Sequence, residues 1–199
     1  MAAVDIVSVA VENNPAPFLS NLRFAIAYEV REPLSDDIEW RVVYVGSAAS
    51  EAHDQELDAV LVPANAPGRF AFVLEVPPPR PDRLPEEDVT GVTIVLLTCS
   101  YRGEEFIRVG YYLCNEYPPE FLREAAVKVK QRLTQAGMSE AEAEAQAAAT
   151  VEISPPQWDR LVRNILADQP RVTRFPCSFD RATAPKAPST NLTTTEGVH

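Results

Sequence analysis

One pair of predicted strands constrains the fold of this 199-residue chain more than any other segment. Residues 91–101 read GVTIVLLTCSY, residues 105–112 read EFIRVGYY, and Arg102-Gly103-Glu104 lies between them. β-Branched and aromatic residues on both sides of a glycine, which tolerates a positive φ, predict a β-hairpin with a tight turn.

Both faces of the first of these strands are apolar. Side chains alternate along a strand, so one face carries Val95, Leu97 and Cys99 and the other carries Val92, Ile94 and Leu96. One apolar face suffices for a sandwich core, and the other needs a cover. Helices between residues 118 and 167 are one candidate cover, and a partner protein that is both apolar and basic is the other. The pattern leaves both alternatives open.

The chain as a whole predicts an all-β fold, an immunoglobulin-like β-sandwich with short helices in the connections. Segments rich in Val, Ile and aromatic residues alternate with proline-rich or polar turns, at a spacing typical of that fold. The predicted strands are Val4–Val11, Leu22–Val30, Glu39–Val45, Leu57–Val62, Arg69–Val76, Val92–Tyr101 and Glu105–Tyr112.

The amino-acid composition changes after Pro118, from strand-forming to helix-forming residues. Helix formers fill residues 120–136, and Ser139-Glu-Ala-Glu142 is a capping box that starts a second, Ala/Glu-rich helix to about residue 150. Apolar residues of the segment 158–166, spaced i, i+3, i+4, i+7 and i+8, predict a third short helix, and residues 171–175 predict one more strand. We expect one domain over 1–175, with a helical insertion at about 120–150, and a disordered tail over 176–199.

The net negative charge of the chain comes from its first part, because acidic and basic residues balance in the rest. Residues 1–119 carry 19 Asp and Glu against 8 Arg, and so the whole net charge of −11. Such a surface disfavours direct nucleic-acid binding and attracts basic proteins in a salt-sensitive manner. The sequence has no apolar run long enough to span a membrane and no secretory signal, and its three cysteines indicate a reducing compartment.

Enzyme chemistry finds little support. The sequence lacks the common nucleotide, metal and nucleophile motifs, and we expect no cofactor and no metal. Ser47 with His53 is the weak nucleophile–base candidate. Glu51, Asp54 and Asp58 would line one face of a helical turn and could bind a hard cation, although a solvated acidic face is the simpler interpretation.

The segment Ser35-Asp-Asp-Ile-Glu-Trp40 permits two interpretations. It is either a helix-like turn that leads into a strand through a core Trp40, or an acidic docking patch beside the apolar Val60, Val62 and Phe72. Composition alone favours the first.

Several long strings identify the chain as similar to a known family. Residues 40–48 (WRVVYVGSA), 101–112 (YRGEEFIRVGYY), 115–117 (NEY), 163–167 (RNILA) and 170–175 (PRVTRF) resemble the anti-silencing-function histone chaperones. The opening Val11–Phe18 is similar as well. The resemblance spans residues 1–117 and resumes at about 156–175.

The resemblance implies a non-enzymatic chaperone of the nucleus, monomeric when free. It would bind one heterodimer of histones H3 and H4, block its tetramerisation and pass it to nucleosome assembly and disassembly factors. Three sets of residues carry the implied contacts. Histone H3 would meet Val45, Asp54, Val92, Ile94, Leu96, Arg108 and Tyr112; histone H4 would meet Tyr111, Arg171, Val172 and Thr173; larger assembly factors would dock a basic motif on Asp36, Asp37, Val60, Val62 and Phe72.

Two departures accompany the resemblance. About 25 residues near 120–149 are extra relative to the family's compact link, and the tail is short and not acidic. The alternative to a histone chaperone is a generic immunoglobulin-like adaptor that binds another basic protein.

Overall fold

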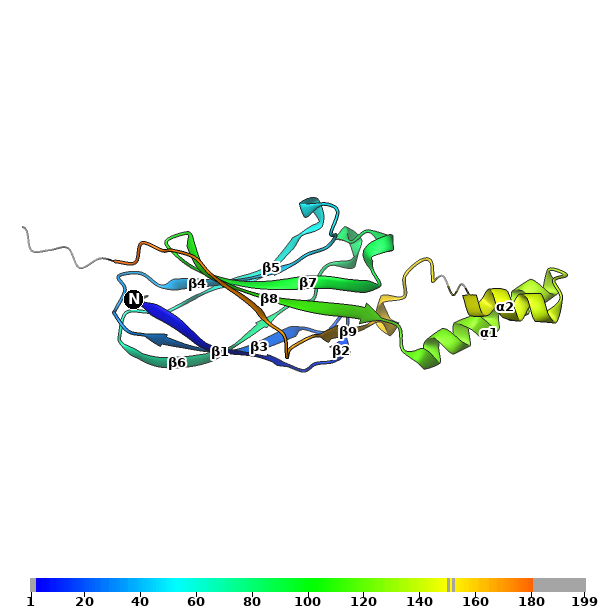
Figure 1. Cartoon of the computed structure of the whole chain (residues 1–199), viewed down its shortest axis with the longest axis horizontal. Coiled ribbons are helices and arrows are strands. Elements are labelled where there is room, and N and C mark those ends of the chain that lie inside the picture. The colour runs from blue at the N-terminus through cyan, green and yellow to red at the C-terminus, as the bar shows by residue number, and fades with distance from the viewer. Residues whose placement is uncertain (1–2, 150, 152, 181–199) are drawn as a thin grey trace, which may run out of the picture.

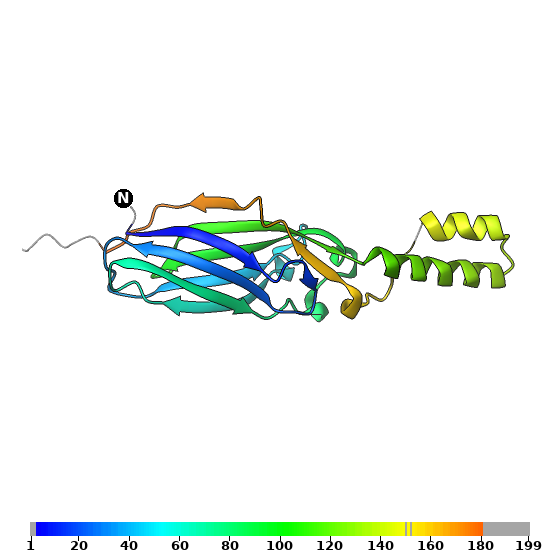
Figure 2. The same ribbon diagram turned by 90° about the horizontal axis from the view of Figure 1, so that it is seen from below.

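Two β-sheets packed face to face form the body of the molecule, with a helical hairpin at one end (Figures 1 and 2). The computed structural model describes residues 3–149, 151 and 153–180. The strands are β1 Val4–Glu12, β2 Ala16–Pro17, β3 Leu22–Val30, β4 Ile38–Tyr44, β5 Gln55–Val62, β6 Gly68–Val76, β7 Gly91–Tyr101, β8 Glu104–Glu116, β9 Val162–Ile165 and β10 Arg171–Arg174. The helices are α1 Pro119–Gln135 and α2 Glu140–Ala149, and single 3₁₀ turns are η1 Glu51–His53, η2 Pro81–Arg83, η3 Glu86–Asp88 and η4 Trp158–Arg160.

The sheets have three and seven strands. The smaller has the order β1-β3-β6, and the larger has the order β2-β9-β8-β7-β4-β5 with β10 also paired to β8. The pairings among the described strands are all antiparallel, which suits sheets that bury one face and expose the other. The predicted all-β sandwich is confirmed.

The core lies between the sheets and follows the alternation of each strand. In β3 every second side chain is buried, beginning with Leu22 and ending with Val30. In β4 the side chains of Ile38, Trp40 and Val42 are completely buried. Fully burying a large apolar side chain contributes about 1.5–3 kcal/mol before entropy is counted, so this period-two pattern fixes which face of each strand points inward.

The hairpin predicted from the sequence joins β7 to β8. Arg102 and Gly103 have φ values of 51° and 80°, so both turn residues occupy the left-handed region that a two-residue hairpin turn requires. Val95, Leu97 and Cys99 are buried, as their face of β7 predicts.

The third predicted helix is wrong. Only η4 is helical in the segment 158–166, and β9 follows it, pairing with β8 and β2. Leu161, Arg163 and Ile165 alternate inward, at exposures of 1%, 1% and 4%. The guanidinium of Arg163 donates to the carbonyl oxygens of Phe18 (3.2 Å), Ser20 (3.1 Å) and Asn21 (3.2 Å), so a charged side chain occupies an interior position of the strand.

The insertion forms a helical hairpin whose helices pack on each other. Gly137, with φ 96°, follows α1, and the Ser139 hydroxyl accepts the amide of Glu142 at 3.4 Å, as the capping box predicts. Ala143 and Ala147 are 0% and 3% exposed, and Lys130 pairs with Glu140 and Glu144 across the hairpin. Figures 1 and 2 show both helices extending away from the end of the sandwich.

The segment after β10 runs along the β7–β8 turn. Phe179 stacks on Tyr101 with ring centroids 6.1 Å apart, and Asp180 accepts hydrogen bonds from the Ser35 amide (2.7 Å) and the Tyr101 hydroxyl (2.8 Å). These residues belong to the tail predicted for 176–199, of which residues 181–199 lie outside the described part. The domain boundary at 175 stays a prediction.

No helix within the described residues is long and apolar enough to cross a membrane.

Candidate functional site

The apolar strip Val92, Ile94 and Leu96 lies on the outer face of the seven-stranded sheet. Val92 is 68% exposed, and Ile94 and Leu96 are half-buried. The alternative in which later helices cover the strip is wrong, because α1 and α2 extend away from the sandwich. β4 widens the strip: the Val45 amide donates to the Ile94 carbonyl at 2.9 Å, and Val43 is the register partner of Leu96.

β8 continues the same surface on the other side of β7. Tyr112, 38% exposed, is the register partner of Ile94, and Gly110 is the partner of Leu96. A Cβ on Gly110 would approach Leu96 Cδ2 to 3.2 Å, so the glycine leaves room for the leucine side chain. The expected residues Val45, Val92, Ile94, Leu96 and Tyr112 therefore form one continuous apolar surface.

Charged side chains lie at opposite borders of this surface. Arg108 donates two hydrogen bonds to the Glu105 carboxylate, from Nε to Oε1 at 2.7 Å and from Nη2 to Oε2 at 2.9 Å. This pairing raises the pKa of Arg108. Asp54 follows η1, and its Oδ1 is buried with no hydrogen-bond partner among the described residues. One border thus holds a satisfied arginine, and the other holds a carboxylate oxygen that lacks a donor.

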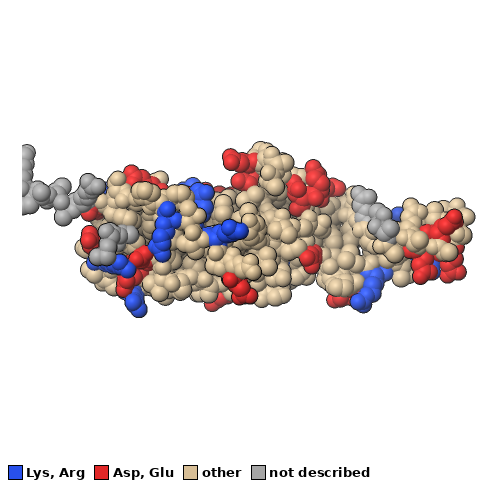
Figure 3. All heavy atoms as spheres, viewed as in Figure 1, with Lys and Arg blue, Asp and Glu red and all other residues tan. Residues whose placement is uncertain are grey.

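Acidic residues also gather on the turns that project beside the strip. Figure 3 shows Asp and Glu clustered over the projecting turns η1 and η3, whereas Lys and Arg gather where β10 crosses β8. The surface around the apolar strip is therefore divided into an acidic side and a basic side, which favours one orientation of a charged ligand.

β10 supplies a second candidate surface. Its four residues are exposed, and it pairs with β8 through Arg171↔Gly110, Val172↔Val109 and Thr173↔Arg108. The Arg171 guanidinium lies 5.9 Å from the centre of the Tyr112 ring, which joins this surface to the apolar strip.

Tyr111 does not share that exposed surface. It is 1% exposed, its ring stacks on Phe24, and its hydroxyl donates to the Val9 carbonyl at 3.2 Å. A groove of about 240 Å³ runs between β1 and β10, and Tyr111 lines it together with Val172 and Arg174. The structure thus places Tyr111 below β10, in the sandwich interior, because neighbouring residues of a strand face opposite sides.

The apolar residues expected to bind assembly factors lie on β5 and β6, which form one edge of the sandwich. Val60 is the register partner of the buried Trp40, and Val62 is the partner of the buried Ile38, so both face the sandwich interior rather than the apolar strip. Phe72 of β6 meets Trp40 edge-to-face, with ring centroids 6.4 Å apart. Val60 and Val62 therefore face away from the strip, and with Phe72 of the three-stranded sheet they form an apolar edge that is separate from it.

Asp36 and Asp37 are exposed on the loop that leads into β4. Asp36 accepts a hydrogen bond from Arg102 Nε, and Arg102 also pairs with Asp180 at 2.8 Å. The segment contains bends and no helical turn, whereas Trp40 is a core residue as the simpler interpretation predicted.

The structure gives no support to the enzyme candidates. Ser47 Oγ accepts the amide of Ala49, and His53 Nδ1 lies 3.2 Å from the carbonyl of Arg83, so their hydrogen bonds run to other groups. The three carboxylates predicted on one helical face do not share one, because η1 ends at His53 and Asp58 lies in β5. Within the described ranges, no group of three or more His, Cys, Asp or Glu could hold a metal ion.

Sequence reasoning missed Val43 and Gly110. Val43 shares the outer face with Val45, so the alternation of β4 carried the signal. Gly110 becomes recognisable only from the register that sets it opposite Leu96.

Comparison with known proteins supplies a further observation. A family model described as ASF1-like histone chaperone matches residues 1–180. Histone chaperone ASF1B of Mus musculus is 46% identical over 180 residues, covering 90% of this chain and 76% of the relative. Probable histone chaperone ASF1A of Arabidopsis thaliana is 44% identical over 183 residues (90% and 78%), and histone chaperone asf1 of Drosophila melanogaster is 42% identical over 180 residues (90% and 71%).

Proposed function

This chain belongs to the ASF1-like histone chaperone family, and from that premise we propose that it binds one H3–H4 heterodimer and blocks its tetramerisation. The family is non-enzymatic, and its work concerns chromatin and nucleosome assembly. The observation that carries the proposal is the apolar strip, which the described parts of the chain leave open to solvent.

Histone H3 binds the strip through the apolar face of a helix. Burial of the exposed Val92, together with Ile94, Leu96 and Tyr112, supplies the buried contact. Asp54 orients the partner because its negative charge at the acidic border of the strip attracts a basic side chain. Arg108, already held in position by Glu105, meets a carboxylate of the histone; Val45 closes the β4 side.

Histone H4 binds at β10 by adding a strand to its free edge. Arg171, Val172 and Thr173 present an exposed, extended backbone for that pairing. Tyr111 supports β10 from below and makes no surface contact of its own, since it is buried. Arg171 lies against the Tyr112 ring, and this contact supports the proposal that a single heterodimer reaches both surfaces.

Larger assembly factors bind the β5–β6 edge through a short basic motif. Val60, Val62 and Phe72 provide the apolar part of this surface, and Asp36 and Asp37 provide its charge. Because Val60 and Val62 lie on the face of the seven-stranded sheet opposite the apolar strip, the chaperone holds a histone dimer and an assembly factor together. We expect the histone dimer to be transferred to the assembly factor in the nucleus. We also expect the free chaperone to be a monomer.

Light scattering coupled to size-exclusion chromatography tests this function. The chain mixed with H3–H4 is expected to elute as one chaperone with one histone heterodimer, and Ile94→Arg is expected to abolish the complex. A complex that contains an intact histone tetramer contradicts the proposal. Equal binding of an unrelated basic protein of similar charge identifies the chain as a generic basic-protein adaptor instead.

A further inference from the structure

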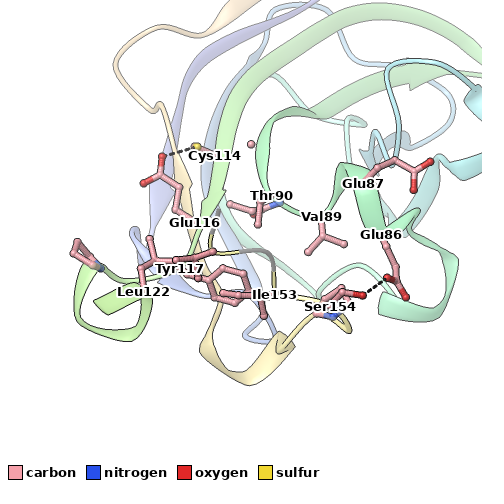
Figure 4. Close-up of a pocket in the computed structure, with 15 residues that line it drawn as sticks. Glu86, Glu87, Val89, Thr90, Cys114, Glu116, Tyr117, Leu122, Ile153 and Ser154 are labelled. Atoms are coloured by element: carbon pink, nitrogen blue, oxygen red, sulfur yellow. Dashed lines mark hydrogen bonds between the residues drawn. The ribbon is translucent and has the colours of Figure 1, made fainter. Parts of the chain in front are cut away.

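A pocket of about 780 Å³ lies at the end of the sandwich, where β7 begins and β8 ends (Figure 4). It is bounded by η3, by the first turns of α1 and by Val151 with residues 153–156, and we call it the junction pocket. Its apolar wall consists of Val89, Pro119, Leu122, Val151, Ile153 and Pro156. The volume is within the range that accommodates several side chains of a ligand.

The inserted helical hairpin contributes to this pocket. Leu122 comes from α1, and it packs partly against the core together with Phe121, whose ring lies 5.2 Å from that of Tyr117. Ile153 comes from the segment that returns to the sandwich and also packs against the core. The extra residues therefore build an apolar surface where they leave and rejoin the sandwich.

The junction pocket is continuous with the apolar strip. Gly91 and Cys114 line the pocket, and Val92 follows Gly91 in β7 and is the register partner of Cys114 in β8. Val92 is the most exposed residue of the strip, at 68%. A ligand that covers Val92 therefore lies at the mouth of the pocket.

The charged residues of the pocket are all acidic. Glu86, Glu87 and Glu116 line it, and its lining includes no arginine or lysine among the residues that the structure describes. Figure 4 shows Glu86 beside Ser154 Oγ, at 3.4 Å, and Glu116 beside the Cys114 thiol, at 2.8 Å. Burial raises the pKa of Cys114 to about 11, so the thiol stays protonated at neutral pH and donates to the carboxylate.

These three glutamates differ from the acids that border the strip on the other side. Glu105 pairs with Arg108, whereas within the described part of the chain no basic side chain pairs with Glu86, Glu87 or Glu116. Their charge is therefore available to a basic ligand.

A buried amide adds an independent observation. Asn115 also lines the pocket and is 1% exposed. Its Nδ2 donates to the Tyr44 hydroxyl at 2.8 Å, but its Oδ1 is buried with no hydrogen-bond partner in the described residues. Buried polar atoms are rarely left without a partner, so the pocket wall contains an acceptor whose hydrogen bond is unmet in the unbound chain.

We propose that the junction pocket is an additional docking surface for the histone heterodimer and takes a basic, partly apolar segment that continues beyond the helix on the apolar strip. This inference rests on the proposed histone-binding function and deepens it. The apolar wall, the acidic border and the continuity with Val92 together select one occupant, a lysine- or arginine-bearing segment of the histone already bound. The insertion thereby enlarges the histone contact of this chain.

Charge-removing variants of the full chain test the proposal. The triple variant combines Glu86→Gln, Glu87→Gln and Glu116→Gln. Its affinity for fluorescently labelled H3–H4 is measured by fluorescence anisotropy at a fixed salt concentration. Each exposed charge contributes about twofold, so the triple variant is expected to bind about tenfold more weakly. The matched control combines Glu32→Gln, Glu75→Gln and Glu124→Gln, which remove the same charge outside the pocket, and its affinity is expected to stay within about twofold.

Hydrogen exchange locates the contact independently of affinity. On addition of H3–H4, amide protection is expected to extend from the strip into residues 86–91 and 114–122. Protection that ends at Val92 and Cys114 overturns the proposal, as does a triple variant that binds as tightly as its control. Loss of a chaperone dimer in the triple variant assigns the pocket to a second copy and overturns it too.

The two hypotheses fail in different ways. If the unmodified chain binds H3–H4 and Ile94→Arg abolishes binding, but the junction variants have no effect, only the junction pocket is wrongly assigned. If the unmodified chain does not bind H3–H4, or Ile94→Arg binds normally, the proposed function itself fails and the pocket assignment fails with it.

Discussion

Ile94→Arg is the substitution that tests the histone surface most sharply. Ile94 is half-buried on the outer face of β7, so its replacement forfeits about 1 kcal/mol of further apolar burial on docking, part of what a fully buried isoleucine contributes. Placing an unpaired arginine in a desolvated contact costs about 3–5 kcal/mol more. The sum, about 4–6 kcal/mol, corresponds to a loss of roughly three to four decades in affinity.

Two further variants separate the parts of this loss. Ile94→Ala removes apolar area without adding charge, and we expect an affinity about five- to tenfold weaker than that of the unmodified chain. Val73→Arg adds the same charge on the outer face of the three-stranded sheet, where the side chain is 47% exposed, and should leave the affinity unchanged.

Isothermal titration calorimetry with H3–H4 measures all three affinities, and urea unfolding establishes that each variant is folded. The free energy of unfolding should change little for Ile94→Arg, because the buried face of β7 carries Val95 and Leu97 instead. A folded Ile94→Arg variant that binds within tenfold of the unmodified chain would refute the reasoning.

Asp37→Ala is expected to weaken a basic assembly-factor peptide about fivefold and to leave H3–H4 affinity unchanged in calorimetry, since a single exposed charge contributes up to about 1 kcal/mol; equal losses for both ligands contradict separate surfaces. Arg163→Met should lower the free energy of unfolding by about 3 kcal/mol in urea titrations, because three backbone carbonyls lose their donor; a loss below about 1 kcal/mol contradicts that role. Hydrogen bonds from Ser35 and Tyr101 lower the pKa of Asp180 to about 2. Its stabilising contribution is therefore complete above the unfolded pKa of about 4 and is lost as the pH falls toward 2, so Asp180→Asn should flatten the pH dependence of stability in that window. An unchanged pH profile contradicts this assignment.

The strands were predictable because their side chains alternate without interruption. β3 matches its predicted bounds, Leu22–Val30, and the β7–β8 turn falls where Gly103 permits a positive φ. β9 was mistaken for a helix because Arg163 occupies an interior position. With a charged residue there, the apolar residues from Trp158 to Leu166 matched a helical period, and the alternation was hidden.

The candidate surfaces were predictable to the extent that one strand defines them. The face of β7 that carries Ile94 followed from alternation, but the assignment of Tyr111 to the surface overlooked that Tyr112 occupies the outer face. The junction pocket could not be predicted, because its walls come from three stretches that are distant in sequence and meet only in the folded chain. Helix-forming residues and a capping box likewise predicted α1 and α2, but not that the two helices pack on each other.

The contact between Arg102 and Asp36 means that one carboxylate of the proposed assembly-factor surface is already paired with a cation of its own chain. Arg102 extends from the β7–β8 turn to Asp36, and Asp180 holds the same guanidinium from the other side. An incoming basic motif that uses Asp36 competes with an internal cation at high effective concentration. A lone lysine merely exchanges one pair for another, so net affinity must come from Asp37 and from the apolar edge. If the proposed assembly-factor motif binds here, the tethered arginine favours motifs that combine charge with apolar side chains over motifs that offer charge alone.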